Sequence, residues 1–478
     1  MSGVLNFGSM TLGVFCLAFL YSSLDWVGEK RNRLLAVFLT LTGTPLFYYS
    51  FIDTTYAHAA TAFASGLFVW FWLRTSQEEA APKGTAASRP LKRKETPASL
   101  SALRWGTLGL LAGIAACVRT QEILIVLAPA WEWFRRFRLE PERRGGLWKS
   151  AAATAAGFMI GFSPQLLVWK LLYGSFLAAP AAFNLSWSNF SLGETIFSSY
   201  HGLLAWTPLY ALASAGLLWE GLVGDWRAGV LFLIIAGQIL INSFSVAWWG
   251  GQAFGLRQLT GTSLIVGLGA AYFIRRSGEP ATIRRKAAIF AACLCSLWTA
   301  LLALLCAGGR LDTLLYVSPR ELAAAAASFR PALQAIRQIL AARDAPTPDF
   351  LISVLLVELL AGFWLRRSIV EERRESRLTP SRWLQATLLC LVLFADGKIL
   401  QARLGPRPEF VPGTFLDAAQ LGDFFKSETY AAKGLYYAKR GEKNAADASF
   451  SRAESILPGS SATAPWRELF QHWQRNNK

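Results

Sequence analysis

Long apolar runs separated by short polar segments form the dominant pattern along this chain of 478 residues. A helix of about 20 apolar residues, rising 1.5 Å per residue, crosses the ~30 Å hydrocarbon core of a bilayer. The runs of roughly that length are Leu34–Phe51, Ala57–Leu73, Ala151–Leu172, Ala228–Val246, Ala287–Ala307, Phe350–Leu365 and Trp383–Leu400. Shorter runs are Leu5–Tyr21, Trp105–Val118, Ile123–Phe134, Leu203–Trp219 and Thr262–Ile274. The pattern predicts an all-α, polytopic membrane protein with about twelve transmembrane helices within residues 1–400.

Lysine and arginine gather in every second segment between these runs. They are dense around Lys30, between Lys83 and Lys94, between Arg135 and Lys149, around Arg284, and between Arg366 and Arg382. By the positive-inside rule, these basic segments face the cytoplasm and the intervening segments face outward. The alternation places the first residues outside, and it also places the tail from Gln401 outside.

Composition agrees with a membrane protein, because 53% of the residues are hydrophobic and 19 are tryptophan. The net charge of +17 would suit nucleic acid, but the basic residues recur between the runs and form no single stripe. We therefore expect membrane lipid, and no nucleic acid, as a partner. The six cysteines all fall within apolar runs, which predicts small packing residues rather than disulfides or metal ligands.

Two polar segments interrupt the membrane pattern. Thr75–Leu103 is rich in Ala, Pro, Ser, Thr, Lys and Glu without an apolar period, which predicts a disordered cytoplasmic loop. In the outer loop 309–349, apolar side chains recur at helical spacing through Glu321–Ala342. This spacing predicts an amphipathic helix that lies on the membrane surface or covers a cavity.

The tail, residues 401–478, is polar and helix-forming, and its segment Ser427–Ser460 resembles one tetratricopeptide repeat. The matching positions are Tyr430, Gly434, Tyr437, Ala446, Phe450, Ala453 and Pro458, whereas Lys433 departs from the pattern. A single repeat cannot bury its own apolar face, so we expect flanking helices to cap it. The tail is thus predicted to be a small extramembrane helical unit that binds a protein partner through residues 427–475. An ordinary helical hairpin packed on the membrane face is the alternative.

Motifs of soluble enzymes are absent from the sequence, which has no phosphate-binding glycine loop, no HExxH and no nucleophile elbow. Polar and aromatic residues gather instead at the predicted outer ends of the helices. They include Asp53, Tyr56, His58, Arg119, Gln121, Trp187, His201, Trp248, Trp249, Gln252 and Arg257. We expect any chemistry to take place at those outer ends.

Five stretches within Leu34–Phe273 resemble, in order and spacing, bacterial multispanning glycosyltransferases of the GT-C superfamily. They are TPLFYYSFIDTTYAHAATAF (Thr44–Phe63), GLLAGIAACVRTQ (Gly109–Gln121), GFSPQLLVWKLLYGSFL (Gly161–Leu177), SSYHGLLAWTPL (Ser198–Leu209) and WWGGQAFGLRQL (Trp248–Leu259). Those proteins are similar to mannosyl- and aminoarabinosyl-transferases, which take a sugar from a polyprenyl-phosphate carrier. The resemblance implies a glycosyltransferase of the bacterial inner membrane that acts on an unidentified acceptor at the outer or periplasmic face.

An anionic lipid donor needs a cation near the outer interface, and Arg119, Arg257 and Lys170 are the candidates for binding its phosphate. For Arg119 an ion pair with Glu122 is an equally good interpretation, and for Lys170 snorkelling to the interface is the better one. The candidates for binding sugar or acceptor are Tyr56, His58, Gln121, Trp187, His201, Trp248, Trp249 and Gln252. Interfacial tryptophans are also expected as membrane anchors, and a lone His58 is more often a residue that hydrogen-bonds a helix end.

The sequence departs from the GT-C pattern at its start. The family places a catalytic acidic residue in the first outer loop, after a first helix that enters from the cytoplasm, and the sequence lacks both. Inverting transfer needs a carboxylate to accept the proton of the acceptor hydroxyl. Among the outer acidic residues Asp53, Glu122, Glu194 and Asp312, we predict Asp53 as the substitute base. No cofactor is predicted, and no ligand set supports a divalent metal.

Two other functions remain open from the sequence. A transporter or flippase of lipid-linked saccharides would need charged or interrupted helices inside the membrane, and the sequence has no clear pair of half-helices. A non-catalytic membrane scaffold that recruits partners through its tail would explain the missing acidic loop.

Overall fold

The computed structural model describes residues 2–25, 32–54, 56–78, 98–177, 185, 190–245, 248–251, 253–307, 311, 317–327, 427, 430–431, 433–435, 437–438 and 441–456. Every element in these residues is helical, apart from a single backbone bridge between Leu185 and Ser245. The predicted all-α fold is therefore confirmed for the part of the chain that the structure describes.

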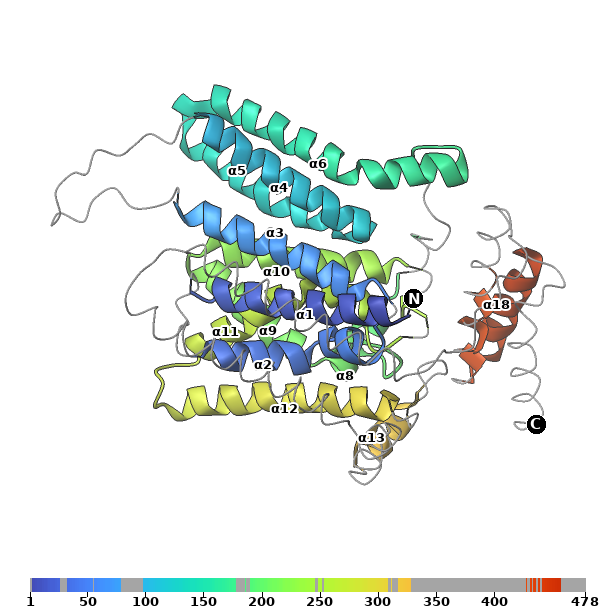
Figure 1. The fold of residues 1–478 in the computed structure, drawn as a ribbon. Coiled ribbons are helices and arrows are strands. Elements are labelled where there is room, and N and C mark those ends of the chain that lie inside the picture. Colours follow the sequence, from blue (N-terminus) through green and yellow to red (C-terminus); the bar gives the residue numbers. More distant parts are fainter. Residues whose placement is uncertain are drawn as a thin grey trace.

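The helices follow most of the apolar runs of the sequence, and short 3₁₀ or π turns (η) join several of them (Figure 1). The run Leu34–Phe51, predicted as one spanning helix, is divided before Pro45 into α2 and η1, and the run Leu203–Trp219 is divided before Pro208 into α8 and α9. Their bounds are α1 (Ser2–Ser23), α2 (Arg33–Gly43), η1 (Tyr48–Ile52), α3 (His58–Glu78), α4 (Ala98–Val118), η2 (Thr120–Val126), α5 (Leu127–Leu139), η3 (Pro141–Arg143), α6 (Arg144–Tyr173), α7 (Leu192–Phe197), α8 (Leu203–Trp206), α9 (Leu209–Val223), α10 (Trp226–Ser243), η4 (Arg257–Thr262), α11 (Ser263–Arg276), α12 (Ile283–Ala307), α13 (Pro319–Ala327) and α18 (Lys443–Ile456).

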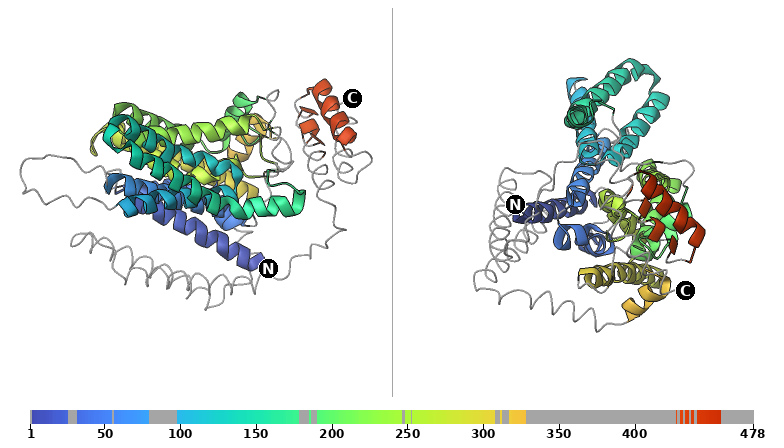
Figure 2. Two further views of the ribbon diagram at one scale, coloured as in Figure 1. Left: turned by 90° about the horizontal axis from the view of Figure 1, so that it is seen from above. Right: turned by 90° about the vertical axis from the view of Figure 1, so that its right-hand side faces the viewer.

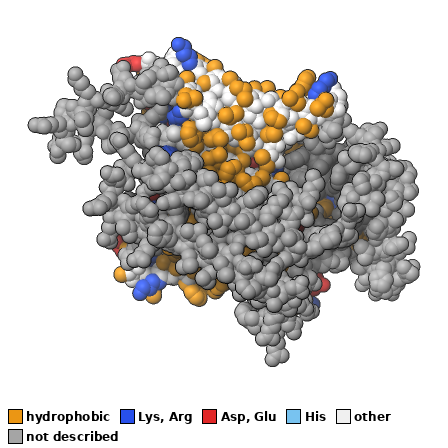
Figure 3. Space-filling model, in the orientation of Figure 1, with side chains coloured by type: hydrophobic (Ala, Val, Ile, Leu, Met, Phe, Trp, Pro, Cys, Tyr) orange, Lys and Arg blue, Asp and Glu red, His pale blue; other side chains and the backbone are white. Residues whose placement is uncertain are grey.

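Within the described residues, three helical segments are long and apolar enough to cross a membrane, namely Arg144–Leu171, Trp226–Ser243 and Ile283–Ala307. Large apolar side chains on them are exposed, including Met159, Ile160, Leu167, Leu233, Leu240, Phe290, Leu294 and Leu297. Figure 3 shows hydrophobic side chains gathered over the upper helices, with basic side chains toward either end. A continuous exposed apolar surface of this kind is what lipid-facing helices carry. The fold thus suits a helical membrane protein. The number of about twelve spans stays a prediction, and its last two runs, Phe350–Leu365 and Trp383–Leu400, lie outside the described residues.

Successive long helices along the chain run in opposite directions, which gives the bundle two distinct ends (Figures 1 and 2). The hydroxyl of Ser9 in α1 donates to the carbonyl of Thr54 (2.8 Å), close to the start of α3, and the hydroxyl of Ser22 accepts from Trp70 Nε1 near the end of α3 (3.1 Å). Helices α1 and α3 are therefore parallel neighbours, and the short α2, which connects them in sequence, runs in the opposite direction. We call the end where α3 begins the Arg119 end, and the end where α3 finishes the Glu132 end.

Helices α4, α5 and α6 form a layer on one side of the remaining helices, and glycines set the close approach of α4 to α6 (Figure 2). A Cβ added to Gly109 or Gly113 would overlap backbone carbonyl oxygens of α6, and one added to Gly157 or Gly161 would overlap those of α4. Both pairs have the small-xxx-small spacing that lets membrane helices pack backbone to backbone. Parallel α4 and α6 are thereby held together, and α5, which lies between them in sequence, runs in the opposite direction beside them.

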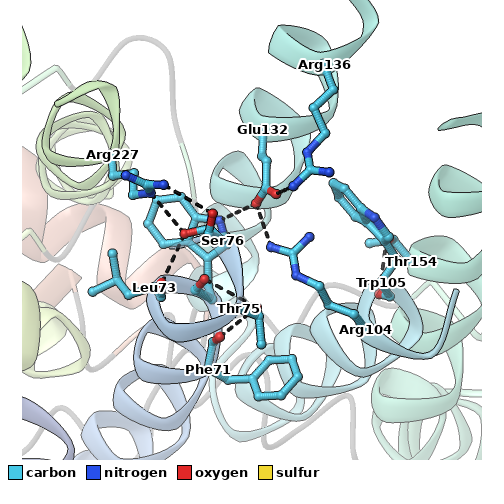
Figure 4. Close-up of polar contacts among 11 residues, drawn as sticks. Phe71, Leu73, Thr75, Ser76, Arg104, Trp105, Glu132, Arg136, Thr154 and Arg227 are labelled. Atoms are coloured by element: carbon cyan, nitrogen blue, oxygen red, sulfur yellow. Dashed lines mark hydrogen bonds and ion pairs between the residues drawn. The ribbon is translucent and has the colours of Figure 1, made fainter. Parts of the chain in front are cut away.

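At the Glu132 end, buried ion pairs connect the helices (Figure 4). Glu132 of α5 is 2% exposed and lies 2.9 Å from Nη2 of Arg104 in α4 and 2.6 Å from Nη2 of Arg136. It also accepts a hydrogen bond from Trp72 Nε1 of α3 at 2.9 Å. The carboxylate therefore joins three helices, and each of its charged partners compensates for its removal from water.

Other arginines at this end are paired in the same way. The carboxylate of Glu220 in α9 lies 2.7 Å from both Arg275 and Arg276 of α11, and Arg33 pairs with Asp25. Arg227 of α10 donates to the hydroxyl of Ser76 in α3 at 2.9 Å. This end of the bundle is thus joined by charged contacts between helices that are distant in sequence.

The predicted disordered loop Thr75–Leu103 is shorter than expected, because α3 continues to Glu78 and α4 begins at Ala98. The Thr75 hydroxyl donates to the carbonyl of Phe71 one turn earlier (2.8 Å), and Ser76 also contacts Arg227. These bonds satisfy the polar side chains inside a helix, so the polar composition did not end it. The rest of the predicted loop, 79–97, lies outside the described residues.

Only the start of the predicted amphipathic helix Glu321–Ala342 can be compared with the structure, where α13 covers Pro319–Ala327. A capping box begins this helix: the backbone N–H of Glu321 donates to the Ser318 hydroxyl (3.2 Å), and the Ser318 N–H donates to the Glu321 carboxylate (2.7 Å). The sequence interpretation missed this S-x-x-E signal. Leu322 is buried in the same apolar cluster as Tyr49 and Trp206, so α13 packs on the Arg119 end.

The described part of the tail has the close packing that the repeat-like pattern predicts at several positions. A Cβ on Gly434 would lie 2.7 Å from the Phe450 ring, and Ala446 and Ala453 of α18 are buried. The Ser427 hydroxyl donates to the carbonyl of Ala453 at 2.9 Å. The assignment as a tetratricopeptide repeat stays a prediction, and residues 457–478 lie outside the described part.

Candidate functional site

Arg119 lies at the point where α4 ends and η2 begins. Its backbone is extended (φ −154°, ψ 116°), which terminates the helix after Val118. Its Nη1 lies 3.1 Å from Nδ1 of His58, the first residue of α3. Guanidinium groups only donate hydrogen bonds, so this contact requires Nδ1 to accept and leaves the ring proton on Nε2. Sequence reasoning placed both residues in one site, and the structure brings them into direct contact.

Arg257, the first residue of η4, faces the same region from a different part of the chain. Its guanidinium carbon lies 5.0 Å from the centroid of the Tyr56 ring, a cation–π distance. Arg257 is close enough to Arg119 for the two positive charges to repel each other. Gly251 adjoins Arg257, since a Cβ there would be in ordinary van der Waals contact with Nη2 of Arg257 at 3.6 Å, and its φ of +76° lies in the left-handed region that favours glycine.

The predicted alternative for Arg119, an ion pair with Glu122, is not formed. Glu122 is within electrostatic range of Arg119, but its carboxylate instead accepts from the Ser65 hydroxyl (3.0 Å) and from Nε2 of Gln238 (3.3 Å). Across the described residues, neither Arg119 nor Arg257 has a carboxylate at ion-pair distance. The first turn of η2 explains the correction, because it directs Glu122 into the core between α3 and α10, away from the guanidinium.

Tyr49 connects the two arginines to the predicted base, Asp53. Its hydroxyl accepts from the backbone N–H of Phe254 (2.8 Å), and its ring centroid lies 4.4 Å from that of His58. Tyr49 belongs to the π turn η1, where the N–H of Asp53 donates to the carbonyl of Tyr48 (2.8 Å). Both Asp53 and Arg257 are within electrostatic range of Tyr49. Irregular turns of this type are frequent at functional sites. The sequence placed Phe47–Tyr49 among the polar and aromatic residues at the outer helix ends, but it indicated no particular role for Tyr49.

Rings continue from this group toward the loop that carries Trp248 and Trp249. The successive ring pairs, with centroid distances, are Tyr48–Phe254 (4.7 Å), Phe254–Trp206 (5.4 Å), Trp206–His201 (5.2 Å), His201–Tyr200 (4.4 Å), Tyr200–Trp249 (6.1 Å) and Trp249–Trp248 (5.9 Å). We call Tyr200, Trp248 and Trp249 the aromatic cluster. Five of the predicted sugar-contacting residues, Tyr56, His58, His201, Trp248 and Trp249, therefore belong to one continuous series of ring contacts that reaches the arginines.

The aromatic cluster is not an open surface, although it was predicted as a set of faces for a sugar. Trp248 and Trp249 are 2% and 1% exposed, and His201 is fully buried. His201 also has φ +62°, in the left-handed region that favours glycine. A non-glycine residue held there stores strain, which is common at functional sites. These rings are buried because loops that are distant in sequence pack together, and the sequence pattern did not predict this burial.

The remaining predicted site residues are divided between other places. Gln121 is buried, and its Nε2 donates to the backbone carbonyl of Gln238 in α10 at 3.4 Å. Lys170 donates to the carbonyl of Gly174 at 2.8 Å, so it caps its own helix. Trp187 and Gln252 lie outside the described residues.

An apolar groove of about 630 Å³ lies between α4, α5 and α6. Its lining residues are Trp105, Ile123, Val126, Pro129, Ala130, Trp133, Trp148, Ala151, Thr154, Ala155, Phe158 and Met159. Ile123 and Val126 belong to η2, the turn that follows Arg119, so the groove begins close to the guanidinium in sequence. Its lining suits a hydrocarbon chain better than a polar ligand.

Among the described residues, no group of three or more His, Cys, Asp or Glu side chains forms a metal site. The sequence prediction of no cofactor stays untested by this observation. In comparisons with known proteins, no family model, no curated protein and no solved structure matches this chain.

Proposed function

We propose that this protein is an integral membrane glycosyltransferase that takes a sugar from a polyprenyl-phosphate donor and transfers it to an acceptor outside the membrane. One observation carries the proposal. Arg119 and Arg257 lie together at one end of an apolar helix bundle, without a carboxylate at ion-pair distance in the described part of the chain. The resemblance of the sequence to the GT-C superfamily supplies the reaction.

Two neighbouring guanidinium groups favour an anion. Each charge loses solvation where the protein surrounds it, and the two groups repel each other. A phosphate would offset both costs through charge-assisted hydrogen bonds, which arginine forms in bidentate geometry. His58 already accepts from Arg119, so it limits the orientations in which the remaining guanidinium donors face a ligand.

The groove between α4, α5 and α6 supports a lipid as the source of this phosphate. A free phosphate needs no adjoining hydrocarbon surface, whereas a lipid phosphate has a chain that must leave the site. In the proposal the phosphate binds at Arg119 and the chain enters the groove past Ile123 and Val126. The Arg119 end then faces outward from the bacterial inner membrane, with the tail on the same side.

The proposed reaction uses Asp53 as the base. The acceptor hydroxyl attacks the anomeric carbon of the sugar, and the bond from that carbon to the phosphate oxygen breaks. The hydroxyl proton passes to the Asp53 carboxylate, and the polyprenyl phosphate leaves on Arg119 and Arg257. Tyr49, which is within range of Asp53 and Arg257, connects the proton-accepting and phosphate-binding sides of the site.

The test measures binding of undecaprenyl phosphate and of uncharged undecaprenol to the full chain in lipid nanodiscs. We expect the wild type to bind the phosphate more tightly than the alcohol. Arg119→Gln and Arg257→Gln should each weaken phosphate binding by about 10- to 150-fold, since a charged hydrogen bond contributes about 1.5–3 kcal/mol. Lys170→Gln is the matched control and should bind normally, because Lys170 caps its own helix.

Equal binding of the phosphate and the alcohol, or unchanged binding in both arginine variants, would contradict the phosphate site. Transfer itself is tested with radiolabelled polyprenyl-phosphate sugars and a membrane extract as the source of acceptor. Asp53→Asn should abolish label transfer while phosphate binding persists. Transfer that continues in Asp53→Asn would remove Asp53 from the role of base.

A transporter of lipid-linked saccharides is the second candidate, because of one observation. Two helices that run from the Arg119 end to the Glu132 end, α5 and α11, are each preceded by a 3₁₀ turn, η2 and η4 respectively. The buried Glu122 lies in η2. Interrupted helices and buried charges near the midplane are features of transporters. Movement of a fluorescent lipid-linked sugar across proteoliposomes that contain no acceptor would favour transport over transfer.

A further inference from the structure

The described part of the tail touches the bundle at the aromatic cluster. Tyr437 packs against Tyr200, Trp248 and Trp249, although it follows them by roughly 190 residues or more in sequence. Figures 1 and 2 show α18 and its neighbouring segments beyond the Arg119 end of the bundle. The rings that were expected to face a sugar are therefore covered, in part, by a ring from the same chain.

A charged residue one turn before Tyr437 strengthens this contact. The ammonium of Lys433 lies 5.8 Å from the centroid of the Tyr437 ring and is within electrostatic range of Glu194 in α7. Burial lowers the pKa of the Lys433 side chain, and the negative charge of Glu194 opposes that shift. Tyr437 and Lys433 thus face two different elements of the bundle, the loop of the aromatic cluster and the helix α7.

The covered loop is the one that leads to Arg257. Asn242 at the end of α10 donates to the carbonyl of Trp248 (2.7 Å), which holds the loop in place. Gly250 and Gly251 follow with φ of +82° and +76°, and Gly251 approaches Arg257. A group that lies on Trp248 and Trp249 therefore adjoins the site of the two arginines.

The contacts inside the tail are of a different kind from those it makes with the bundle. Within the tail, Phe450 packs on Gly434, and Ser427 bonds to Ala453, so its segments are packed on one another. Among the described residues, the aromatic ring of Tyr437 and the charge of Lys433 face the bundle. A unit packed on the outside of a bundle opens at a lower free energy than the bundle core.

We propose that the tail, through its described residues 430–431, 433–435, 437–438 and 441–456, is a lid that closes over the aromatic cluster with Tyr437 and Lys433. In the closed state Tyr437 occupies the ring face that a sugar or another flat ligand would use, so the tail must move before Trp248 and Trp249 can bind one. Lid movements of this type commonly control access to membrane-exposed and solvent-exposed sites. The tail would close over the aromatic cluster in this way whether or not the protein transfers a sugar.

Hydrogen–deuterium exchange on the full chain in lipid nanodiscs tests the lid without a ligand. Tyr437→Ala should speed exchange in peptides covering 198–202 and 248–251 by about ten-fold or more, because an aromatic contact that holds the closed state is lost. Exchange in 443–456 should stay slow. Lys443→Ala is the control within the tail, since Lys443 is exposed, and it should leave all these peptides unchanged.

A charge exchange provides a second, independent variant. Lys433→Glu should also speed exchange in 248–251, and adding Glu194→Lys in the same chain should slow it again, because the opposite charges then face each other. Unchanged exchange at 198–202 and 248–251 in both Tyr437→Ala and Lys433→Glu, with 443–456 protected, would overturn the lid. If Tyr437→Ala also speeds hydrogen–deuterium exchange in 443–456, the charge-swapped pair decides. Slower exchange at 248–251 in the double variant Lys433→Glu with Glu194→Lys than in Lys433→Glu alone supports the lid, and equal exchange in the two overturns it.

Discussion

Arginine side chains have different kinds of partner at the two ends of the helix bundle. At the Glu132 end, Arg104 and Arg136 share the buried carboxylate of Glu132, and Arg275 and Arg276 share that of Glu220. At the Arg119 end, the guanidinium groups contact a histidine and a tyrosine ring and have no carboxylate at ion-pair distance among the described residues. The same type of side chain therefore has fixed counter-ions at one end, and at the other end none at ion-pair distance among the described residues.

The difference indicates which charges serve the fold and which are available to a ligand. A buried charge with a fixed counter-ion has its electrostatic requirement met inside the protein, and its removal exposes the partner to an uncompensated cost. Arginines without such a partner leave that requirement open, which is a property of anion-binding sites. This contrast supports the phosphate site more directly than the number of basic residues does.

Among variants that test this contrast, substitution of Glu132 should have the largest effect on stability. Glu132→Ala leaves Arg104 buried without its carboxylate, so the free energy of unfolding should fall by about 3–5 kcal/mol. Denaturation of the protein in detergent micelles would measure this loss. Glu142→Ala, an exposed acidic residue in η3, is the control and should change stability by less than about 0.5 kcal/mol. Equal stability of the two variants would show that the ion pairs at the Glu132 end are not structural.

The second largest effect is expected on adding a ligand, which should depend on the arginines of the Arg119 end and not on those of the Glu132 end. Saturating undecaprenyl phosphate, at about 100 times its Kd, should stabilise the wild type by about 2.7 kcal/mol through mass action. The stabilisation should disappear in the double variant Arg119→Gln and Arg257→Gln and should persist in Arg276→Gln at the opposite end. Thermal melting with and without the lipid is the measurement. Loss of the ligand effect in Arg276→Gln as well would mean that the ends do not differ in anion binding.

Close helix packing, rather than ion pairing, is tested by glycines of the α4–α6 layer. Gly113→Ala adds a Cβ where the α6 backbone leaves no room, so it should cost about 1–3 kcal/mol. Gly145→Ala, in the same helix pair but with open space around it, should leave stability unchanged or raise it slightly. Chemical denaturation of both variants gives the comparison. If Gly113→Ala lowers the free energy of unfolding as much as Glu132→Ala does, helix packing contributes as much to stability as the ion pairs of the Glu132 end.

The smallest effect is expected where the arginines lack counter-ions. Arg257→Gln removes a positive charge that repels Arg119, so the free energy of unfolding should stay within about 1 kcal/mol of wild type and tend to rise. The gain should shrink as salt screens the repulsion. Denaturation at low and high ionic strength measures both. A loss as large as that for Glu132→Ala would indicate a structural role and would remove the contrast between the two ends.

Most of the helical architecture was accessible from the sequence, because it depends on local properties. Apolar runs of sufficient length specify membrane-compatible helices wherever they fold, since an unpaired backbone is costly in lipid. The alternation of helices along the chain also placed Arg119, Arg257, His58 and Tyr56 at one end, where the structure has them. The polar side chains of Thr75 and Ser76 were misread only because they bond to the preceding turn or to α10.

The sequence by itself therefore determined the helices, their apolar character and the end at which the site lies. Tertiary structure alone decided that Glu122 faces Ser65 and Gln238 instead of Arg119, and that the Tyr49 hydroxyl accepts a hydrogen bond from the backbone of Phe254. It also decided that Tyr437 covers Trp248 and Trp249. The physical reason is that these contacts join segments tens to hundreds of residues apart, and their geometry depends on how the helices pack. Periodicity and composition describe one segment at a time and carry no information on which side chains of another segment will meet it.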